Sequence, residues 1–196
     1  SSQGAGVVNV GDVNGDGYDD FALRDGVAGA SNAMYVVYGR AGLSTVELSE
    51  LQAVNNTAGF IVSGINGSQI STAGDVNGDG LNDILISGLS TTAYVVLGKT
   101  ASPGSLALST FAASNGYTIT TPAAIQSTSV IGDVNGDGFE DMYVKLGAGT
   151  GFNNGVTYVV YGGSNTSNIS LPSVTTATTF SNGFTISANG TIVIGS

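Results

Sequence analysis

The sequence predicts an all-β fold made of repeated units, and three observations lead to this prediction. An acidic segment occurs three times, as GDVNGDGYDD, GDVNGDGLND and GDVNGDGFED. Short runs rich in β-branched and aromatic residues recur between its copies in a fixed order, as strands do. Helix signals are scarce, and the best candidate, around Leu43–Val54, is expected to form one or two turns at most. With 196 residues, we expect a single domain over residues 1–196.

The acidic segments set the period of the repeat. They begin at Gly11, Gly74 and Gly132, so successive copies lie 63 and 58 residues apart. Self-similarity at such a spacing is typical of proteins built from one repeated supersecondary unit. We therefore expect three repeats, over residues 11–73, 74–131 and 132–194.

Each repeat contains four strand signals, bounded by Gly, Asn or Ser. The first follows the acidic segment, the second is a Tyr-Val-Val-x-Gly run, the third begins with Gly and an aromatic residue, and the fourth leads into the next acidic segment. The expected strands are Phe21–Arg24, Tyr35–Gly39, Gly59–Ser63 and Gln69–Ala73; Ile84–Ser87, Tyr94–Gly98, Gly116–Thr120 and Ser127–Ile131; and Met142–Leu146, Tyr158–Gly162, Gly183–Ser187 and Thr191–Ile194. Four short antiparallel strands at this period are typical of a propeller blade, so the sequence predicts a β-propeller-like domain of three four-stranded blades.

The two ends of the chain carry the same part of the repeat. A lead strand over residues 4–10 and a last strand over residues 191–195 both precede the position of an acidic segment. One of them is redundant in a unit of three blades. Either the three blades close on themselves, or the extra strand completes a blade elsewhere. We expect the second arrangement, in which another copy of the chain or a neighbouring propeller module is joined by strand addition. The segments Ser102–Asn115 and Ser164–Asn182 are expected to be solvated connections.

Composition excludes several classes of function. The chain has no His and no Cys, so it has no imidazole base, no thiolate and no disulfide framework. Only four Lys and Arg stand against fourteen Asp and Glu, too few to neutralise a phosphate backbone, which argues against nucleic-acid binding. No apolar run approaches the length of a membrane-spanning helix, so no membrane insertion is expected.

Eleven of the fourteen acidic residues lie in the three acidic segments. Each segment has the pattern Asp-x-Asn-x-Asp-Gly-x-x-Asp, which offers four side-chain oxygen ligands and, at position seven, a backbone carbonyl. The predicted metal ligands are Asp12, Asn14, Asp16, Tyr18 and Asp20; Asp75, Asn77, Asp79, Leu81 and Asp83; and Asp133, Asn135, Asp137, Phe139 and Asp141.

Five oxygen ligands plus water fit the coordination of Ca²⁺, whereas Mg²⁺ takes fewer protein ligands. The sequence therefore predicts three calcium sites. The alternative is a set of Asp-, Asn- and Gly-rich turns capped by their own side chains. Such turns do not require three carboxylates at fixed spacing in every copy. The loops are not EF-hands, because position twelve is Leu23, Ile86 or Val144, inside an expected strand, where an EF-hand has a bidentate Glu.

These residues resemble a known family. GDVNGDG, an Asp three residues later, a β-branched strand and a Tyr-Val-Val-x-Gly strand are similar to the FG-GAP repeat of integrin α-subunit propellers and their bacterial or archaeal relatives. The resemblance covers all three repeats, from Gly11 to Gly195. It implies a β-propeller with calcium-binding loops, although integrin-like propellers usually have seven blades.

The expected function is that of a calcium-binding structural or adhesion module, extracellular or on the cell surface, which is part of a larger propeller or of a self-associating assembly. The alternative is a carbohydrate-binding, lectin-like propeller, whose ligand would be a surface glycan. Absence of Trp argues against that alternative. We do not expect an enzyme, because the acidic residues outside the ligand set form no recurring pair of the kind that glycosidases need.

Overall fold

The computed structural model of the protein describes residues 6–24, 32–42, 45–65, 69–88, 90–147, 156–173, 179–180 and 183–187. Strands dominate this part of the chain, and its helices are short. The strands are β1 (Val7–Gly11), β2 (Asp20–Arg24), β3 (Ala33–Val37), β4 (Gly59–Ser63), β5 (Gln69–Gly74), β6 (Asp83–Ser87), β7 (Thr92–Val96), β8 (Ser105–Ala107), β9 (Gly116–Thr120), β10 (Ile125–Gly132), β11 (Asp141–Leu146), β12 (Val156–Val160), β13 (Ile169–Ser170), β14 (Thr179–Phe180) and β15 (Gly183–Ser187). The helices are α1 (Leu48–Leu51), η1 (Leu108–Thr110) and η2 (Ala113–Asn115), so the all-β prediction is confirmed.

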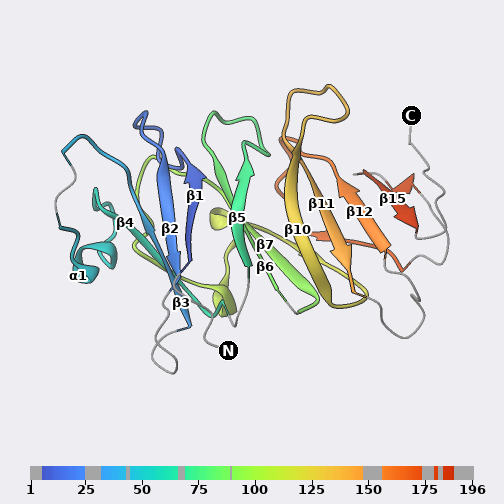
Figure 1. Ribbon diagram of the computed structural model, residues 1–196, viewed down its shortest axis with the longest axis horizontal. Coiled ribbons are helices and arrows are strands. Elements are labelled where there is room, and N and C mark those ends of the chain that lie inside the picture. Colours follow the sequence, from blue (N-terminus) through green and yellow to red (C-terminus); the bar gives the residue numbers. More distant parts are fainter. Residues whose placement is uncertain are drawn as a thin grey trace.

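The strands form three five-stranded sheets, and none of the three is closed. Sheet 1 has the order β1-β2-β3-β4-β8, sheet 2 the order β5-β6-β7-β9-β13, and sheet 3 the order β10-β11-β12-β15-β14. The sheets stand side by side along the long axis of the molecule (Figure 1). The first strands β1, β5 and β10 are neighbours, since β5 contacts both of the others.

Each sheet begins one strand before its acidic loop. β1 pairs with β2, β5 with β6, and β10 with β11, all antiparallel. The register shifts at the last residue of each first strand, where Gly11, Gly74 and Gly132 have positive φ values of 76°, 69° and 83°. These β-bulges turn the chain out of the ladder and into the loop. The lead strand is thus the first strand of sheet 1, while residues 191–195 lie outside the described residues.

The fifth strands correct one expectation. The segments Ser102–Asn115 and Ser164–Asn182 are not only solvated connections. β8 adds to β4 and β13 adds to β9, both in parallel, so each of these segments reaches back to the preceding sheet. Their apolar residues are buried, with Leu106 at 7%, Leu108 at 6% and Leu171 at 4% exposure. Two or three alternating residues among many Ser and Thr are too short a pattern to predict a strand.

Two apolar cores hold the sheets together. The first joins sheets 1 and 2 and contains Met34, Val36, Ile84 and Ile86 among others. The second joins sheets 2 and 3, through residues such as Leu85 and Val144. Sheet 2 is covered on both faces, and every residue of β6 is buried. The outer face of sheet 1 packs against the segment around α1, whose Leu51 is 1% exposed.

None of the helices in the described residues is long and apolar enough to cross a membrane.

Candidate cation-binding loops

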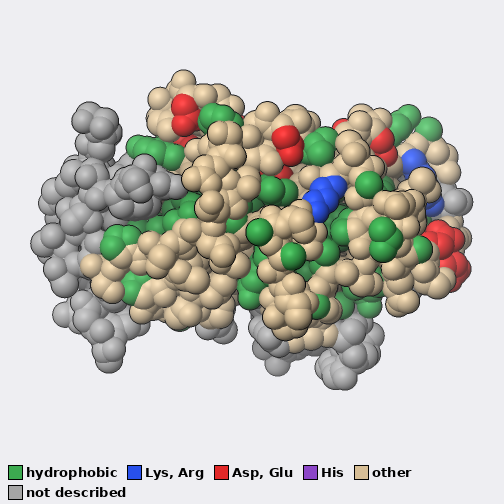
Figure 2. Space-filling view, turned by 180° about the vertical axis from the view of Figure 1, so that it is seen from behind, with side chains coloured by type: hydrophobic (Ala, Val, Ile, Leu, Met, Phe, Trp, Pro, Cys, Tyr) green, Lys and Arg blue, Asp and Glu red, His purple; other side chains and the backbone are tan. Residues whose placement is uncertain are grey.

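The three acidic loops lie at one edge of the molecule. Loop 1 (residues 12–20), loop 2 (residues 75–83) and loop 3 (residues 133–141) connect the first and second strands of their sheets. They project from the same edge, at the top of the view in Figure 1. Seen from behind, acidic side chains lie in separate groups along this upper edge, with basic patches below them, and a further acidic group lies lower at the right-hand side (Figure 2). The loops are therefore three separate acidic sites.

The first Asp of each loop organises the turn that follows it. In loop 1, the Asp12 carboxylate accepts backbone N–H groups from Gly15 at 2.7 Å, Asp16 at 3.2 Å and Gly17 at 2.8 Å. Asp75 and Asp133 accept the same three bonds in their loops, at 2.7 to 3.1 Å. Gly17 supplies the sharp reversal, because its φ of 87° is costly for other residues.

The third and fifth positions are hydrogen-bonded to each other. Asn14 donates its Nδ2 to Oδ2 of Asp16 at 2.9 Å, and Oδ1 of Asp16 accepts the backbone N–H of Tyr18 at 2.9 Å. The same two bonds occur in loop 2, at 2.9 Å each, and in loop 3, at 2.8 and 3.0 Å. Both side chains thus point back into their own loop.

The last Asp of each loop is buried and ties the loop to the sheet. Asp20 is 1% exposed and accepts N–H groups from Val13 at 2.9 Å and Gly39 at 2.7 Å. Asp83 and Asp141, both 0% exposed, do the same. The bonds of Asp83 measure 3.0 Å to Val76 and 2.8 Å to Gly98, and those of Asp141 measure 2.8 and 2.9 Å to Val134 and Gly162. One carboxylate therefore joins the start of the loop to the end of the third strand.

Burial and mutual repulsion act on these last carboxylates. Burial raises the pKa of Asp20 to about 6 and that of Asp83 to about 7, and it also raises the pKa of Asp141. In every loop the charges of the first and fifth-position Asp raise this pKa further. Three like charges in each loop thus interact, and a bound cation would relieve that repulsion.

The donor chemistry of the loops fits a hard cation. Asp16 and Asp20 each accept two hydrogen bonds, and a carboxylate has about four lone-pair sites, so acceptor capacity remains on both. In the residues that the structure describes, no three carboxylates already form a cluster around one metal position. The side chains have instead the arrangement of a self-capped turn, which was the alternative interpretation of the sequence.

All fifteen predicted ligand positions lie in these three loops. Position seven has a second role that the sequence analysis missed. The Leu81 side chain lies over Gly15 of loop 1, and a Cβ added to Gly15 would be 2.8 Å from it. The Phe139 ring lies over Gly78 of loop 2, and a Cβ added to Gly78 would be 2.6 Å from the ring. Their counterpart Tyr18 is 47% exposed. The side chain at position seven therefore packs on the preceding loop.

The glycine that ends each Tyr-Val-Val-x-Gly run also belongs to the site, although it was not among the predicted residues. Gly39, Gly98 and Gly162 donate their N–H groups to the buried Asp of their loops. A Cβ on these residues would meet the backbone of Asp19, Asn82 or Glu140 at 2.3, 2.7 or 2.5 Å. The recurrence of this Gly in phase with the acidic segment was the signal that could have predicted the contact.

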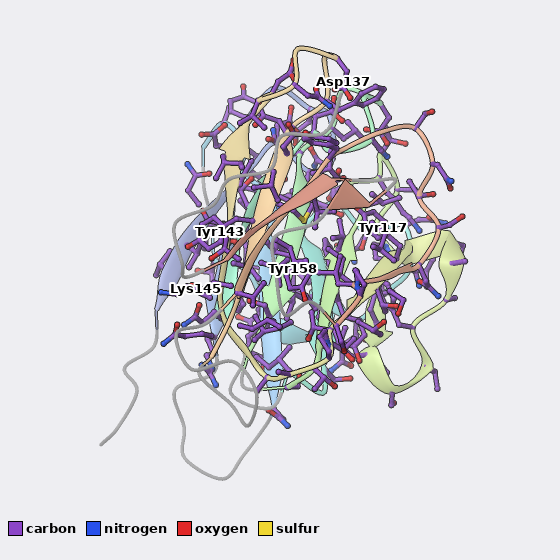
Figure 3. The ribbon with its side chains drawn as sticks, turned by 90° about the vertical axis from the view of Figure 1, so that its right-hand side faces the viewer. Tyr117, Asp137, Tyr143, Lys145 and Tyr158 are labelled. Atoms are coloured by element: carbon purple, nitrogen blue, oxygen red, sulfur yellow. The ribbon has the colours of Figure 1, made fainter. Side chains whose placement is uncertain are left out.

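A groove lies beside loop 3. It encloses about 360 Å³ and is lined by Tyr117, Phe139 and Tyr161 together with polar residues, among them Asp137 and Asn165. Figure 3 shows Asp137 at the top of loop 3, above the strand that carries Tyr117. Of the residues that line this groove, only Asp137 and Phe139 belong to the predicted ligand set.

Sheets packed side by side, each with the same acidic loop at the same edge, define a repeat protein of β-propeller-like type. A family model described as FG-GAP-like repeat matches residues 75–144, which confirms the resemblance predicted from the sequence. The matched region runs from the first Asp of loop 2 through loop 3 and into β11. Modules with FG-GAP repeats are of the β-propeller type and are often extracellular. No curated protein matches the chain.

Proposed function

We propose that the protein is a calcium-binding structural or adhesion module that acts outside the cell or on its surface. The observation that carries the proposal is the threefold recurrence of one oxygen-donor set in one conformation. Hydrogen bonds to Asp12, Asp75 and Asp133 hold the three turns in the same shape, to within about 0.1 Å per bond. Each loop also contains a third carboxylate, on the buried Asp20, Asp83 or Asp141, whose pKa is raised by the charges of the other two.

The ligands that we assign to the cation are those of the sequence prediction. In loop 1 they are the side chains of Asp12, Asn14, Asp16 and Asp20 and the carbonyl of Tyr18, and the corresponding residues hold the cation in loops 2 and 3. A bound Ca²⁺ supplies two positive charges at a place where three carboxylates repel one another. The buried Asp20 holds the loop in place on the sheet. The turn at Gly17 brings the oxygen donors together.

Calcium is preferred to magnesium because each donor set has five protein oxygens, whereas magnesium takes fewer protein ligands. An extracellular location fits such a set, since extracellular calcium modules bind at about 10⁻⁴–10⁻³ M. At these affinities the sites fill only where calcium is abundant. The role that we infer is binding and assembly, with no catalytic step.

A matched pair of variants in loop 1 tests this function. Asp16→Ala removes a proposed ligand, whereas Asp19→Ala removes an exposed carboxylate three residues away that hydrogen-bonds to Asn9 at 3.0 Å. For the unmodified protein, calcium at a hundred times its Kd should raise Tm by about 5–10 °C per filled site, and a chelator should reverse the rise. Asp16→Ala should lose about a third of the rise and Asp19→Ala should keep it. An equal loss in both variants, or no rise at all, would contradict the proposal.

A second function, carbohydrate binding, is favoured by the groove beside loop 3. Aromatic rings next to amide, hydroxyl and carboxylate groups suit a sugar ring, which has apolar faces and polar edges. Tyr161 and Phe139 flank the groove, and Asn165 and Asp137 offer polar groups. A glycan-array signal that Asn165→Ala abolishes, with Asn115→Ala as a control outside the groove, would support it. An array with no bound glycan would remove this alternative.

A further inference from the structure

The contact between sheets 1 and 2, here called junction 1, and the contact between sheets 2 and 3, called junction 2, differ in the space that they enclose. The groove beside loop 3 lies at junction 2 and encloses about 360 Å³. The space at the same place in junction 1 encloses only about 10 Å³. Equivalent residues line the two spaces, among them Leu97, Gly98 and Lys99 at junction 1 and Tyr161, Gly162 and Gly163 at junction 2. Both junctions lie inside the chain, so the difference arises from their residues.

A lysine side chain lies in junction 1 where junction 2 is open. Lys99 and Gly163 are equivalent, because each donates its backbone N–H to a carbonyl of the preceding acidic loop at 2.8 Å. The Lys99 side chain lines the space in junction 1, and its Nζ donates to the carbonyl of Ser114 and, at 2.8 Å, to Oδ1 of Asn115. A Cβ added to Gly163 would meet nothing within 4 Å. The groove is therefore open at the position from which Lys99 extends in junction 1.

The groove presents groups that attract a cation. The aromatic rings of Tyr117, Phe139 and Tyr161 line it, and ring faces attract ammonium groups within about 6 Å. Asp137 adds a carboxylate, whose two oxygens each accept one hydrogen bond inside loop 3, at 3.0 and 2.8 Å. A carboxylate has about four lone-pair sites, so acceptor capacity remains. Among the described residues that line the groove, none is Lys or Arg, so this lining offers no opposite charge to an anion.

The chain has only four basic residues. Arg24 and Arg40 belong to the first repeat, and Lys99 lines junction 1. Figure 3 shows Lys145 well away from Tyr117. The formal net charge is −10, and a field of this sign favours the approach of cations. A positively charged occupant of the groove would therefore come from another molecule.

We propose that the groove beside loop 3 binds a primary ammonium group on a carbon frame, in the place that Lys99 occupies at junction 1. The carbon frame contacts the rings of Tyr117, Phe139 and Tyr161, and the ammonium group pairs with the carboxylate of Asp137. This chemistry has two sources, the lysine side chain of another protein and an amino sugar. For the amino sugar, the inference rests on the carbohydrate function proposed above and narrows it; for the lysine side chain, it is independent of that function.

Calcium in loop 3 should oppose this binding. Asp137 is also a proposed calcium ligand, and a carboxylate that holds Ca²⁺ attracts an ammonium group less strongly. Coupling between two binding equilibria is reciprocal, and we expect saturating calcium to weaken the binding of the amine about fivefold. This clause alone rests on the calcium proposal.

Two-dimensional NMR of the isotope-labelled chain in chelator measures the binding. The ligands are two matched pairs in which acetylation removes the charge: Nα-acetyl-lysine methylamide with its Nε-acetylated form, and glucosamine with N-acetylglucosamine. At least one of the two amines should bind with a Kd of about 1 mM. It should shift the amide signals of Gly162 and Gly163 but not that of Gly98. Its acetylated partner should bind about tenfold more weakly, and the amine that binds more tightly identifies the source.

A matched pair of variants locates the charge that the amine needs. Asp137→Asn removes the charge from the groove and should weaken the amine about tenfold. Asp79→Asn is the control, because Asp79 accepts the same two hydrogen bonds in loop 2, at 2.9 Å each, and does not line the groove. It should leave the Kd unchanged. Tyr161→Leu introduces the residue found at Leu97 of junction 1, and it should weaken the amine while calcium still binds.

The outcomes separate this inference from the proposed functions. Absence of signal shifts with both amines, at up to about 20 mM, overturns the inference, as does an equal effect of Asp137→Asn and Asp79→Asn. An acetylated ligand that binds as tightly as its amine also overturns it, and for N-acetylglucosamine that result would support a neutral sugar as the ligand. Amine binding that is equal with and without calcium leaves the ammonium site standing and contradicts the calcium site in loop 3.

Discussion

The carboxylate of Asp83 accepts a hydrogen bond from the backbone N–H of Gly98 at 2.8 Å, fifteen residues further along the chain. Its other oxygen accepts the N–H of Val76 at 3.0 Å. This contact fixes the start of loop 2 to the end of β7, and the equivalent contacts of Asp20 and Asp141 do the same in sheets 1 and 3. The buried Asp is thus a structural element of the sheet as well as a proposed cation ligand.

Replacing Asp83 should destabilise the protein even without metal. Asp83→Ala leaves the buried N–H groups of Val76 and Gly98 without an acceptor, which costs about 1–3 kcal/mol for each unsatisfied group. Urea unfolding in chelator measures the loss. Asp79→Ala is the matched control, because Asp79 is exposed and its bonds lie within the loop; it should cost clearly less. Equal losses would contradict a structural role for Asp83.

Substitution of Gly98, whose backbone N–H donates to Asp83, should lower the stability of the protein to a similar extent. In Gly98→Ala the new Cβ would lie 2.7 Å from the carbonyl oxygen of Asn82 and 2.9 Å from that of Val13, so the junction between sheets 1 and 2 must shift. We expect a loss of about 1–3 kcal/mol, typical of overpacking. Gly147→Ala is the control, since its nearest neighbour, the carbonyl oxygen of Ala124, is 3.8 Å away. A Gly98→Ala protein as stable as Gly147→Ala would be inconsistent with the close packing at this glycine.

The metal-free protein should lose stability as the pH rises from about 4 to 7. Burial raises the pKa of Asp20 to about 6 and that of Asp83 to about 7, from 3.8. The folded state therefore binds these protons more tightly than the unfolded state does. Proton binding by Asp20 and Asp83 thus adds to the free energy of unfolding at low pH, and this stabilisation is lost as the pH passes the folded pKa values. Thermal melts in chelator between pH 4 and 8 check this. A Tm that rises steadily over that range would contradict it.

Calcium should reverse this dependence. A cation competes with protons for the same carboxylates, so its stabilising effect should grow from pH 5 to 7. Melts at saturating calcium over the same range measure the difference. An effect of calcium that is independent of pH would show that the buried Asp residues are not among its ligands.

The repeat made most of the fold predictable. Strands whose sequences recur in phase, such as Tyr35–Gly39 and Gly59–Ser63, appear as β3 and β4, because three copies of a weak signal reinforce one another. Even the short helix within Leu43–Val54 was expected, and it forms as α1. β8 and β13 were not predicted, since their pairing with the preceding sheet depends on contacts across 44 and 50 residues that no local pattern encodes.

The candidate site was predictable in composition but not in its supporting contacts. Side-chain oxygens at fixed spacing identify Asp12, Asn14, Asp16 and Asp20 as one set. The sequence does not show that Asp20 is buried, nor that Gly39 binds it. Nor does it show that Leu81 and Phe139 serve the junctions between sheets. These properties arise from packing between elements that lie far apart in the chain.

Native mass spectrometry of the intact chain, with calcium added after complete removal of metal, tests the central claim most directly. We predict a main species with three Ca²⁺ ions per chain, and a species with two in the Asp16→Ala variant. A spectrum without discrete calcium adducts, or one in which Asp16→Ala still binds three ions, would contradict the claim that each acidic loop is a calcium site.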